Sequence, residues 1–304
     1  MTTTPLCQPV SFITTDQLQL SGLLFGNPKA KTAYIFVHGL SSDVFSRLEL
    51  ITPLANEHTQ VLHFNNRGHD QITCLKRLDP TSEEGYTAET IGAAHEVFTD
   101  CVHDIQGAID FLEERGVEGI YLVGHSTGCQ KAVYYLSQRP SKSVKRAVLL
   151  CPLSDYADFK ANDTPAAQAK ALNAATKLVE QGKPHDLLPK SVWPDLHDAQ
   201  RFLSLYTPDS EEEIFTYAQP DKEPTTLQAV TIPLHIMLAG DDEYADRPAA
   251  KIGQWFKDVL PKDKVSVTVI AGATHNLSGR GEEVRKQLKL AKSRLDGTKA
   301  NDII

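Results

Sequence analysis

A strand, a sharp turn and a helix follow one another in the middle of this chain without a spacer. Residues 120–123 (Ile-Tyr-Leu-Val) form an apolar run, and a helix-like stretch begins at Cys129. Small residues two positions before and two after Ser126 allow a tight turn that points the serine hydroxyl over the sheet edge. The turn is made of Gly124, His125, Ser126, Thr127 and Gly128. The sequence therefore predicts an α/β sheet with a nucleophilic serine at this turn.

A nucleophilic serine needs a base that accepts its proton and a carboxylate that orients the base. Candidates for both follow Ser126, each directly after a predicted strand. The strand 265–270 is followed by a turn that carries His275, and the strand 234–238 by a turn with Asp241, Asp242 and Glu243. These turns are expected at the same sheet edge as Ser126. The chain order serine, acid, histidine predicts a catalytic triad.

An acyl-transfer site also needs backbone N–H donors aimed at the charge that develops on the carbonyl oxygen. One expected donor is the amide of Thr127, directly after the nucleophile. The other is expected from the loop after the strand 33–37, which continues with His38, Gly39 and Leu40. Gly39 permits the turn, and the Leu40 amide is the predicted second donor. His38 is expected to pack against the neighbouring loop and has no predicted chemical role.

These motifs give the chain a resemblance to α/β-hydrolase superfamily serine hydrolases over about residues 30–295. The His-Gly pair at 38–39, the Asn-Arg-Gly turn at 66–68, the serine turn, the acid turn and His275 fall in family order. A narrower resemblance, to a branch that includes fungal esterases of hydroxamate siderophores, is carried by GHSTGCQ at 124–130, DEY at 242–244 and HNLS at 275–278. The chain departs from that branch around His38 and after Asn65. The resemblance implies ester-bond hydrolysis on an α/β-hydrolase fold.

The resemblance also bears on which carboxylate is the acid. In related hydrolases the acid lies a few residues before the next helix, which is expected here near Asp246 and Pro248. Asp242 fits that position best, while Asp241 and Glu243 stay open. Asp242 therefore completes the predicted catalytic set with the serine and the histidine.

Strand and helix alternate over most of the chain, which predicts a mostly parallel sheet with helices on both faces. Residues 10–14 and 18–25 alternate apolar and polar positions and predict an antiparallel hairpin at the sheet edge. The stretch between Asn65 and Ala94 is far longer than a typical connection and is expected to be a functional loop. A long helix is predicted over 94–114, where apolar residues recur at three- and four-residue steps.

Residues 153–229 leave this alternation. They contain the predicted helices 166–181 and 198–206 and a run that opens at Ser210, with Glu213 completing a capping box. In α/β-hydrolases this is the place of the cap. Residues 1–152 and 230–304 are therefore predicted as the core domain and 153–229 as an inserted helical cap. Six residues could line an acyl pocket or form the core of the cap itself: Trp193, Phe202, Leu205, Tyr206, Phe215 and Tyr217.

Charge and hydropathy exclude several classes of partner. The net charge of −8 and the lack of a lysine or arginine run argue against nucleic-acid binding. No stretch approaches the roughly 20 apolar residues of a membrane helix, and the first ten residues lack the features of a signal peptide. A cytoplasmic protein without a membrane span is expected.

No metal and no cofactor are expected from the sequence. The five cysteines are odd in number and irregularly spaced, so they are interpreted as reduced thiols packed like small hydrophobic residues. His95 and His103 lie eight positions apart, too far on a helix to share one ion without help. No dinucleotide or phosphate loop is present.

The predicted function is hydrolysis of small-molecule carboxylic esters through a serine acyl-enzyme. The same triad would also serve a serine peptidase, an amidase or a thioesterase. A second alternative is a non-catalytic α/β-hydrolase-like binding protein.

Overall fold

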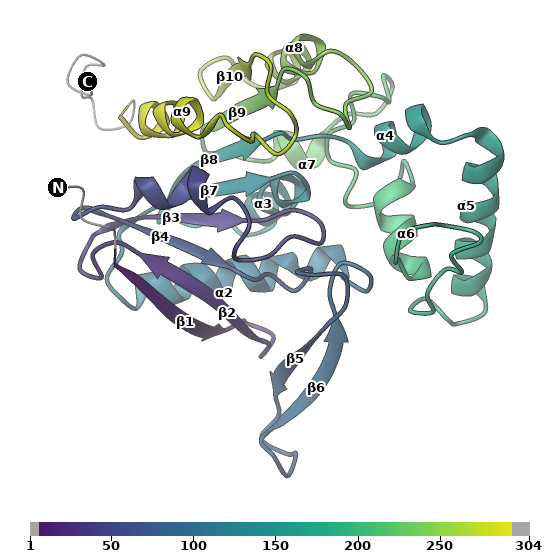
Figure 1. The fold of residues 1–304 in the computed structure, drawn as a ribbon, viewed down its shortest axis with the longest axis horizontal. Helices are drawn as coiled ribbons and strands as arrows, with labels where there is room; N and C mark the ends of the chain where they lie inside the picture. The colour runs from purple at the N-terminus through teal and green to yellow at the C-terminus, as the bar shows by residue number, and fades with distance from the viewer. Residues whose placement is uncertain (1–5, 294–304) are drawn as a thin grey trace.

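An eight-stranded sheet forms the centre of the molecule in the computed structural model, which describes residues 6–293 (Figure 1). The strand order is β1-β2-β4-β3-β7-β8-β9-β10. β1 pairs antiparallel with β2, β2 pairs antiparallel with β4, and the other neighbours are parallel. The strands are β1 (Cys7–Ile13), β2 (Gln19–Phe25), β3 (Thr32–Val37), β4 (Thr59–Phe64), β7 (Gly119–His125), β8 (Val144–Leu150), β9 (Leu234–Ala239) and β10 (Val265–Ile270). This is the α/β-hydrolase fold that the sequence predicted.

Both faces of the sheet are covered by helices, because the central strands are apolar on both sides. On one face, alternate strand residues such as Leu122 pack with helices α2, α3 and α8. On the other face, residues such as Tyr121 and Val123 pack with α1, η1 and α9. These helices are α1 (Leu48–Ile51), η1 (Thr52–Leu54), α2 (Cys101–Glu113), α3 (Thr127–Gln138), α8 (Ala249–Val259) and α9 (Gly281–Ser293).

Four helices lie between β8 and β9: α4 (Asp155–Asn162), α5 (Pro165–Glu180), α6 (Ala199–Tyr206) and α7 (Thr225–Gln228). Figure 1 shows α4, α5 and α6 grouped beside the ends toward which the arrows of β7 and β8 point. These three helices share a hydrophobic cluster centred on Phe159, Trp193 and Phe202. α7 instead packs on α3 through Leu227, which belongs to the main core.

The helix predicted to open at Ser210 does not form, and residues 207–224 are turns and irregular chain. The Glu213 amide does donate to the Ser210 hydroxyl, at 3.2 Å. However, the Glu213 carboxylate accepts hydrogen bonds from Ser154 and Gln219 instead of returning to the cap residue. Of the two hydrogen bonds of a capping box, only the one from the Glu213 amide to the Ser210 hydroxyl is therefore present, and no helix follows it.

The predicted long loop between Asn65 and Ala94 is wrong in one respect, because most of it is a hairpin of β5 (Thr73–Leu78) and β6 (Tyr86–Ile91). The hairpin projects away from the main sheet (Figure 1). The helix predicted over 94–114 also begins later, with η2 (Phe98–Asp100) ahead of α2. Gly92, at a φ of 104°, turns the chain, and the amides of His95 and Glu96 close on its carbonyl.

None of the helices described between residues 6 and 293 combines the length and the apolar character needed to cross a bilayer. All five cysteines are free thiols. Cys101, Cys129 and Cys151 are buried, as expected for small hydrophobic residues, whereas Cys7 and Cys74 are exposed on outward-facing strand positions and contradict that expectation.

Candidate active site

Ser126 occupies the turn between β7 and α3. Its backbone has a positive φ of 55° with ψ −128°, a conformation that costs energy for a residue with a side chain. The flanking glycines make the turn possible. A Cβ on Gly124 would lie 2.4 Å from the Gly128 carbonyl oxygen, and one on Gly128 would lie 2.1 Å from the carbonyl oxygen of Val37. The backbones of β3, β7 and α3 therefore meet at a distance that only glycine allows.

The structure brings the predicted serine, histidine and acid together. His275 Nε2 lies 2.8 Å from Ser126 Oγ. On the other side of the ring, Nδ1 lies 2.9 and 3.0 Å from the two carboxylate oxygens of Asp242. The side chains of His275 and Asp242 are only 7% and 3% exposed. The three groups form an unbroken hydrogen-bonded line from carboxylate to hydroxyl, the arrangement of a nucleophile with an oriented base.

The other two candidate acids lie elsewhere. Glu243 accepts the backbone N–H of His275 at 2.8 Å. Its small degree of burial opposes the charge, but this bond and its own amide hold the pKa of Glu243 below its usual value. Asp241 has an exposed side chain, and its amide donates to the Ala273 carbonyl at 2.9 Å. Only Asp242 reaches the imidazole ring, while Glu243 orients the histidine backbone.

The predicted oxyanion donors flank the serine. Gly39, Leu40 and Thr127 line the same cavity as Ser126. Thr127 is the first residue of α3, so its amide has no acceptor within the helix. A Cβ on Gly39 would lie 2.7 Å from Ser126 Cβ, which shows how closely the loop after β3 approaches the serine. Both residues predicted to supply the oxyanion donors, Leu40 and Thr127, therefore border the cavity at Ser126.

His38 and Asn66 hold the loop after β3 in place. The Asn66 amide donates to His38 Nε2 at 3.2 Å, and the Asn66 side-chain nitrogen donates to the His38 carbonyl at 3.1 Å. Because Nε2 accepts, the ring proton of His38 lies on Nδ1, which donates to the Gly39 carbonyl at 2.9 Å. Burial holds the pKa of His38 well below its usual value, so the ring stays neutral. His38 therefore packs as predicted and fixes the turn at Gly39.

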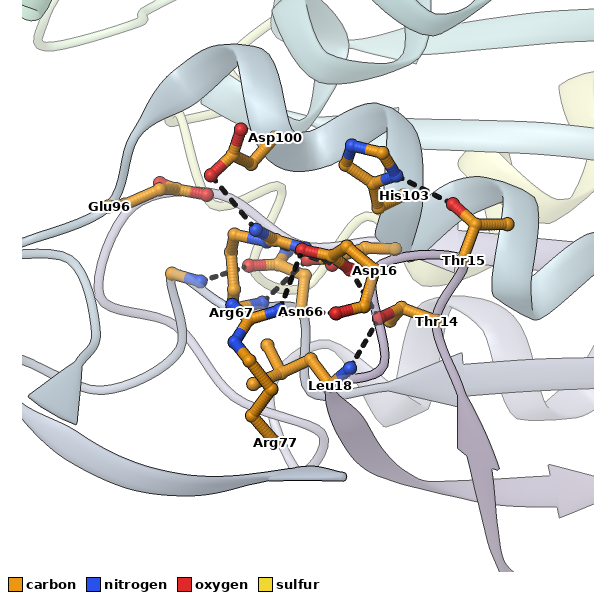
Figure 2. Close-up of polar contacts among 12 residues, drawn as sticks. Thr14, Thr15, Asp16, Leu18, Asn66, Arg67, Arg77, Glu96, Asp100 and His103 are labelled. Atoms are coloured by element: carbon orange, nitrogen blue, oxygen red, sulfur yellow. Dashed lines mark hydrogen bonds and ion pairs between the residues drawn. The ribbon is translucent and has the colours of Figure 1, made fainter. Parts of the chain in front are cut away.

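Arg67, the residue after Asn66, is held by ion pairs and hydrogen bonds of its own. It is buried and donates to Asp104 through Nε at 2.9 Å and Nη2 at 2.7 Å. Figure 2 shows the guanidinium among Asp16, Asp100 and Arg77, which come from the β1–β2 turn, η2 and β5. Burial opposes the positive charge, but Asp104 outweighs it and raises the pKa of Arg67. Arg67 thus anchors the segment that begins with Asn66 to α2.

The cavity above Ser126 has a volume of about 520 Å³. Sequence reasoning did not identify several of its polar wall residues, namely Arg47, Gln130, Ser154, Asp155, Asp158 and Tyr244. A usable signal existed for Asp155, which lies shortly after the end of β8 at the active edge. Arg47 had none, because it follows no strand and belongs to no motif.

Two of these wall residues are acids at the start of α4. Burial, with the nearby Glu212, raises the pKa of Asp155 well above its usual value, and Gln130 Nε2 donates to this carboxyl group at 2.9 Å. Burial also raises the pKa of Asp158. Two carboxyl groups with raised pKa values therefore form part of the cavity wall.

Of the six aromatic and aliphatic residues considered for the acyl pocket, Tyr206 lines the cavity. Trp193 and Phe202 pack inside the cluster of α4–α6. Phe215 and Tyr217 belong to the main core. Trp193, Phe202, Phe215 and Tyr217 are therefore hydrophobic core residues and do not line the cavity.

Between residues 6 and 293, two groups of residues have ligand atoms close enough together for a metal ion. Cys151, Asp242 and His275 form one group, but burial raises the pKa of the Cys151 thiol and keeps it protonated. The other is His95, His185 and Asp198. His103, eight positions after His95, belongs to neither group and contacts Thr15 Oγ1 at 2.6 Å.

Comparison with solved structures places the fold among hydrolases. An esterase of Pyrococcus furiosus is 18% identical at a TM-score of 0.59, covering 95% of this chain and 91% of that one. The Est1E protein of Butyrivibrio proteoclasticus, solved with ferulic acid, is 16% identical at 0.59, covering 92% and 98%. The siderophore hydrolase EstB of Aspergillus fumigatus is 17% identical at 0.60, covering 96% and 98%. At these identities the similarity establishes the fold alone.

Comparison of the sequence with known proteins and protein families gives one match. No curated protein matches this chain. Residues 91–293, more than half of the chain, match the family described as "Protein of unknown function (DUF1749)". The chain belongs to this family and has the α/β-hydrolase fold.

Proposed function

We propose that this protein is a serine hydrolase that cleaves small carboxylic esters, with Ser126 as nucleophile, His275 as base and Asp242 as the orienting acid. The observation that carries the proposal is the continuous line Ser126 Oγ, His275 Nε2, His275 Nδ1 and Asp242, with separations of 2.8 and 2.9 Å. It meets the geometric requirement for an activated serine. The strained backbone of Ser126 supports a role in catalysis rather than in packing.

In the first half of the reaction, His275 Nε2 accepts the Ser126 proton while Oγ bonds to the acyl carbon. The carbonyl electron pair moves onto oxygen, where the amides of Leu40 and Thr127 bind it. Collapse of this intermediate breaks the bond to the alcohol oxygen, which takes the proton from His275. The products are the free alcohol and an acyl-Ser126 ester.

In the second half, water attacks the acyl carbon and gives its proton to His275 Nε2. Collapse then breaks the bond to Ser126 Oγ, which recovers the proton from the imidazole. Asp242 accepts the Nδ1–H throughout and stabilises the imidazolium that forms in each half. We further propose that residues 153–229 act as the cap, because α4 and α6 contribute Asp155, Asp158 and Tyr206 to the cavity wall.

The proposal is tested by comparing p-nitrophenyl acetate with a p-nitroanilide of an amino acid. We expect the ester to be hydrolysed with the larger kcat/KM and both activities to vanish in Ser126→Ala. Faster cleavage of the anilide would contradict the ester preference and favour a peptidase or amidase. A Ser126→Ala variant as active as the native protein would contradict the nucleophile itself.

A further inference from the structure

Two imidazoles and a carboxylate meet where the helical segment joins the core, and none of them lines the Ser126 cavity. His95 follows β6 in the core, whereas His185 and Asp198 lie between α5 and α6. Both histidine Nδ1 atoms lie 3.0 Å from one atom, Oδ2 of Asp198. All three ligand atoms lie within 4.8 Å of one another.

The backbone holds these residues together independently of their side chains. The Asp198 amide donates to the Ala94 carbonyl at 2.8 Å, next to His95. The Gln200 amide donates to the Pro184 carbonyl at 2.9 Å, next to His185. Both histidines are therefore fixed relative to Asp198 before any ion binds, which lowers the ordering cost of forming a metal site.

Asp198 is fully buried and lacks an ion-pair partner of fixed charge among the residues that the structure describes. Its Oδ1 accepts the Arg201 amide at 2.7 Å as the cap of α6, which leaves Oδ2 for the two imidazoles. The Arg201 guanidinium is directed to Glu96 and Glu212 instead. A buried carboxylate needs a cation or several donors. Among the residues that the structure describes, the side chains that contact its Oδ2 are the imidazoles of His95 and His185.

We propose that His95, His185 and Asp198 bind one Zn²⁺ ion at this junction. Zinc takes imidazole nitrogen and carboxylate oxygen at about 2.0–2.2 Å, so ligand atoms around a tetrahedral ion lie roughly 3–3.5 Å apart. The present separations of 3.0 Å from Oδ2 to each Nδ1 match this range, and the two Nδ1 atoms lie within 4.8 Å of each other. Both rings bind through Nδ1 as neutral tautomers that carry their proton on Nε2.

A fourth position on the ion faces open space. A cavity of about 370 Å³ is lined by His95, His185 and Glu89, among others. It provides room for a water molecule as the fourth ligand. Three protein ligands with an open position distinguish this site from a closed structural zinc site with four. An ion there joins the core to the segment between α5 and α6 and stabilises the folded state by binding it preferentially.

The test is calorimetric titration of chelator-treated, dialysed protein with Zn²⁺ and, separately, with Mg²⁺. We expect one Zn²⁺ per chain, a raised melting temperature in its presence, and no binding of Mg²⁺, which prefers an all-oxygen shell. His185→Ala should weaken Zn²⁺ binding by about 100-fold or more, since loss of a direct ligand exceeds the 10–100-fold cost of losing an outer partner. The His185 side chain is exposed, so the variant is expected to fold.

Two further variants sharpen the result. Asp198→Asn keeps an oxygen for the Arg201 amide but removes the negative ligand, and it should weaken binding as His185→Ala does. His58→Ala removes an exposed histidine whose ion pair is with the adjacent Glu57, and it should bind like the native protein. Co²⁺ in place of Zn²⁺ should give visible absorption bands in the native protein and in His58→Ala only. Equal Zn²⁺ affinity in the native protein and His185→Ala, or no saturable binding in the native protein, would overturn the proposal.

Discussion

At the scale of single residues, the candidate site depends on how similar side chains are placed. Asp241, Asp242 and Glu243 are consecutive acids with different partners. The Asp241 backbone amide donates to a backbone carbonyl, the Asp242 carboxylate contacts an imidazole ring, and the Glu243 carboxylate accepts a backbone N–H. The resemblance to related hydrolases favoured Asp242 and left its neighbours open, because a one-residue step in a turn changes the direction of a side chain. That direction depends on the turn conformation, which the residue types alone do not determine.

The proposed roles of the acids predict unequal effects. Asp242→Asn should lower kcat for p-nitrophenyl acetate by about three to four orders of magnitude, since the amide no longer holds the histidine in the productive tautomer. Asp241→Asn is the matched control and should stay close to the native kcat, because its side chain is exposed. Steady-state kinetics on both variants provides the measurement. A larger loss of kcat in Asp241→Asn than in Asp242→Asn would contradict the proposed role of Asp242 as the acid.

Gly39 gives a second test at this scale. Gly39→Ala places a methyl group 2.7 Å from Ser126 Cβ and 3.3 Å from Oγ, so the loop or the serine must move. We expect kcat to fall by about 100-fold, the effect of misplacing a reacting group by about 1 Å. In Gly119→Ala the nearest atom lies 3.9 Å away, and the activity should be unchanged. Equal activity in the two variants would show that the loop after β3 does not contribute to the site.

At the scale of elements, strands were the most predictable part of the fold. The strand 265–270 matches its predicted limits, and the strand 234–238 is one residue shorter than β9, because short apolar runs bounded by turn residues are local signals. The hairpin β5–β6 was missed, since only one of its twelve strand residues is buried and its strands therefore lack the apolar pattern of a core-facing strand. The missing helix at Ser210 has the opposite cause: a correct local capping signal is overridden by the contact of Glu213 with Ser154.

Glu213 connects this irregular segment to the start of α4, and burial raises its pKa to about 7 from 4.5. A folded-state pKa above the unfolded value means that protonation stabilises the fold below about pH 4.5 and that this contribution is lost as the pH rises through 7. Glu213→Gln removes the titration. We expect the variant to be more stable than the native protein at pH 8, by on the order of 2–3 kcal/mol, and the difference to shrink toward pH 5.

Urea unfolding at several pH values measures this effect. Asp209→Asn, at a side chain with 95% exposure, is the control and should follow the native curve. A stability difference between Glu213→Gln and the native protein that stays constant from pH 5 to pH 8 would contradict the shifted pKa.

Arg67 and Arg77 both form ion pairs with Asp16, but one side chain is buried and the other is partly exposed. The pair therefore allows the stability contributions of a buried and an exposed arginine to be compared. The Arg67 side chain is 1% exposed and joins the β1–β2 turn, η2 and α2, whereas the Arg77 side chain is 29% exposed near the end of β5. Arg67→Ala leaves Asp104 as a buried carboxylate without its partner and should cost about 3–5 kcal/mol. Arg77→Ala should cost about 1 kcal/mol or less. Denaturant unfolding compares them, and equal losses would contradict the assignment of Arg67 as the anchor.

At the scale of the whole molecule, the candidate site is assembled from segments far apart in the sequence. The loop after β3, the turn after β7, the acid turn after β9 and the histidine loop after β10 meet at the same edge of the sheet. A parallel sheet brings these turns together, so the alternation of strand and helix was enough to predict that they meet. The wall formed by α4 and α6 could not be predicted in the same way, because no strand register fixes the position of helices outside the sheet.

The central claim is that Ser126 is an activated nucleophile. Intact-mass measurement after exposure to a fluorophosphonate tests it directly, because an activated serine oxygen displaces fluoride from phosphorus and keeps the phosphonyl group. We predict one adduct on the native chain and none on Ser126→Ala. An adduct of equal yield on Ser126→Ala, or none on a native chain that is folded by circular dichroism, would contradict the claim.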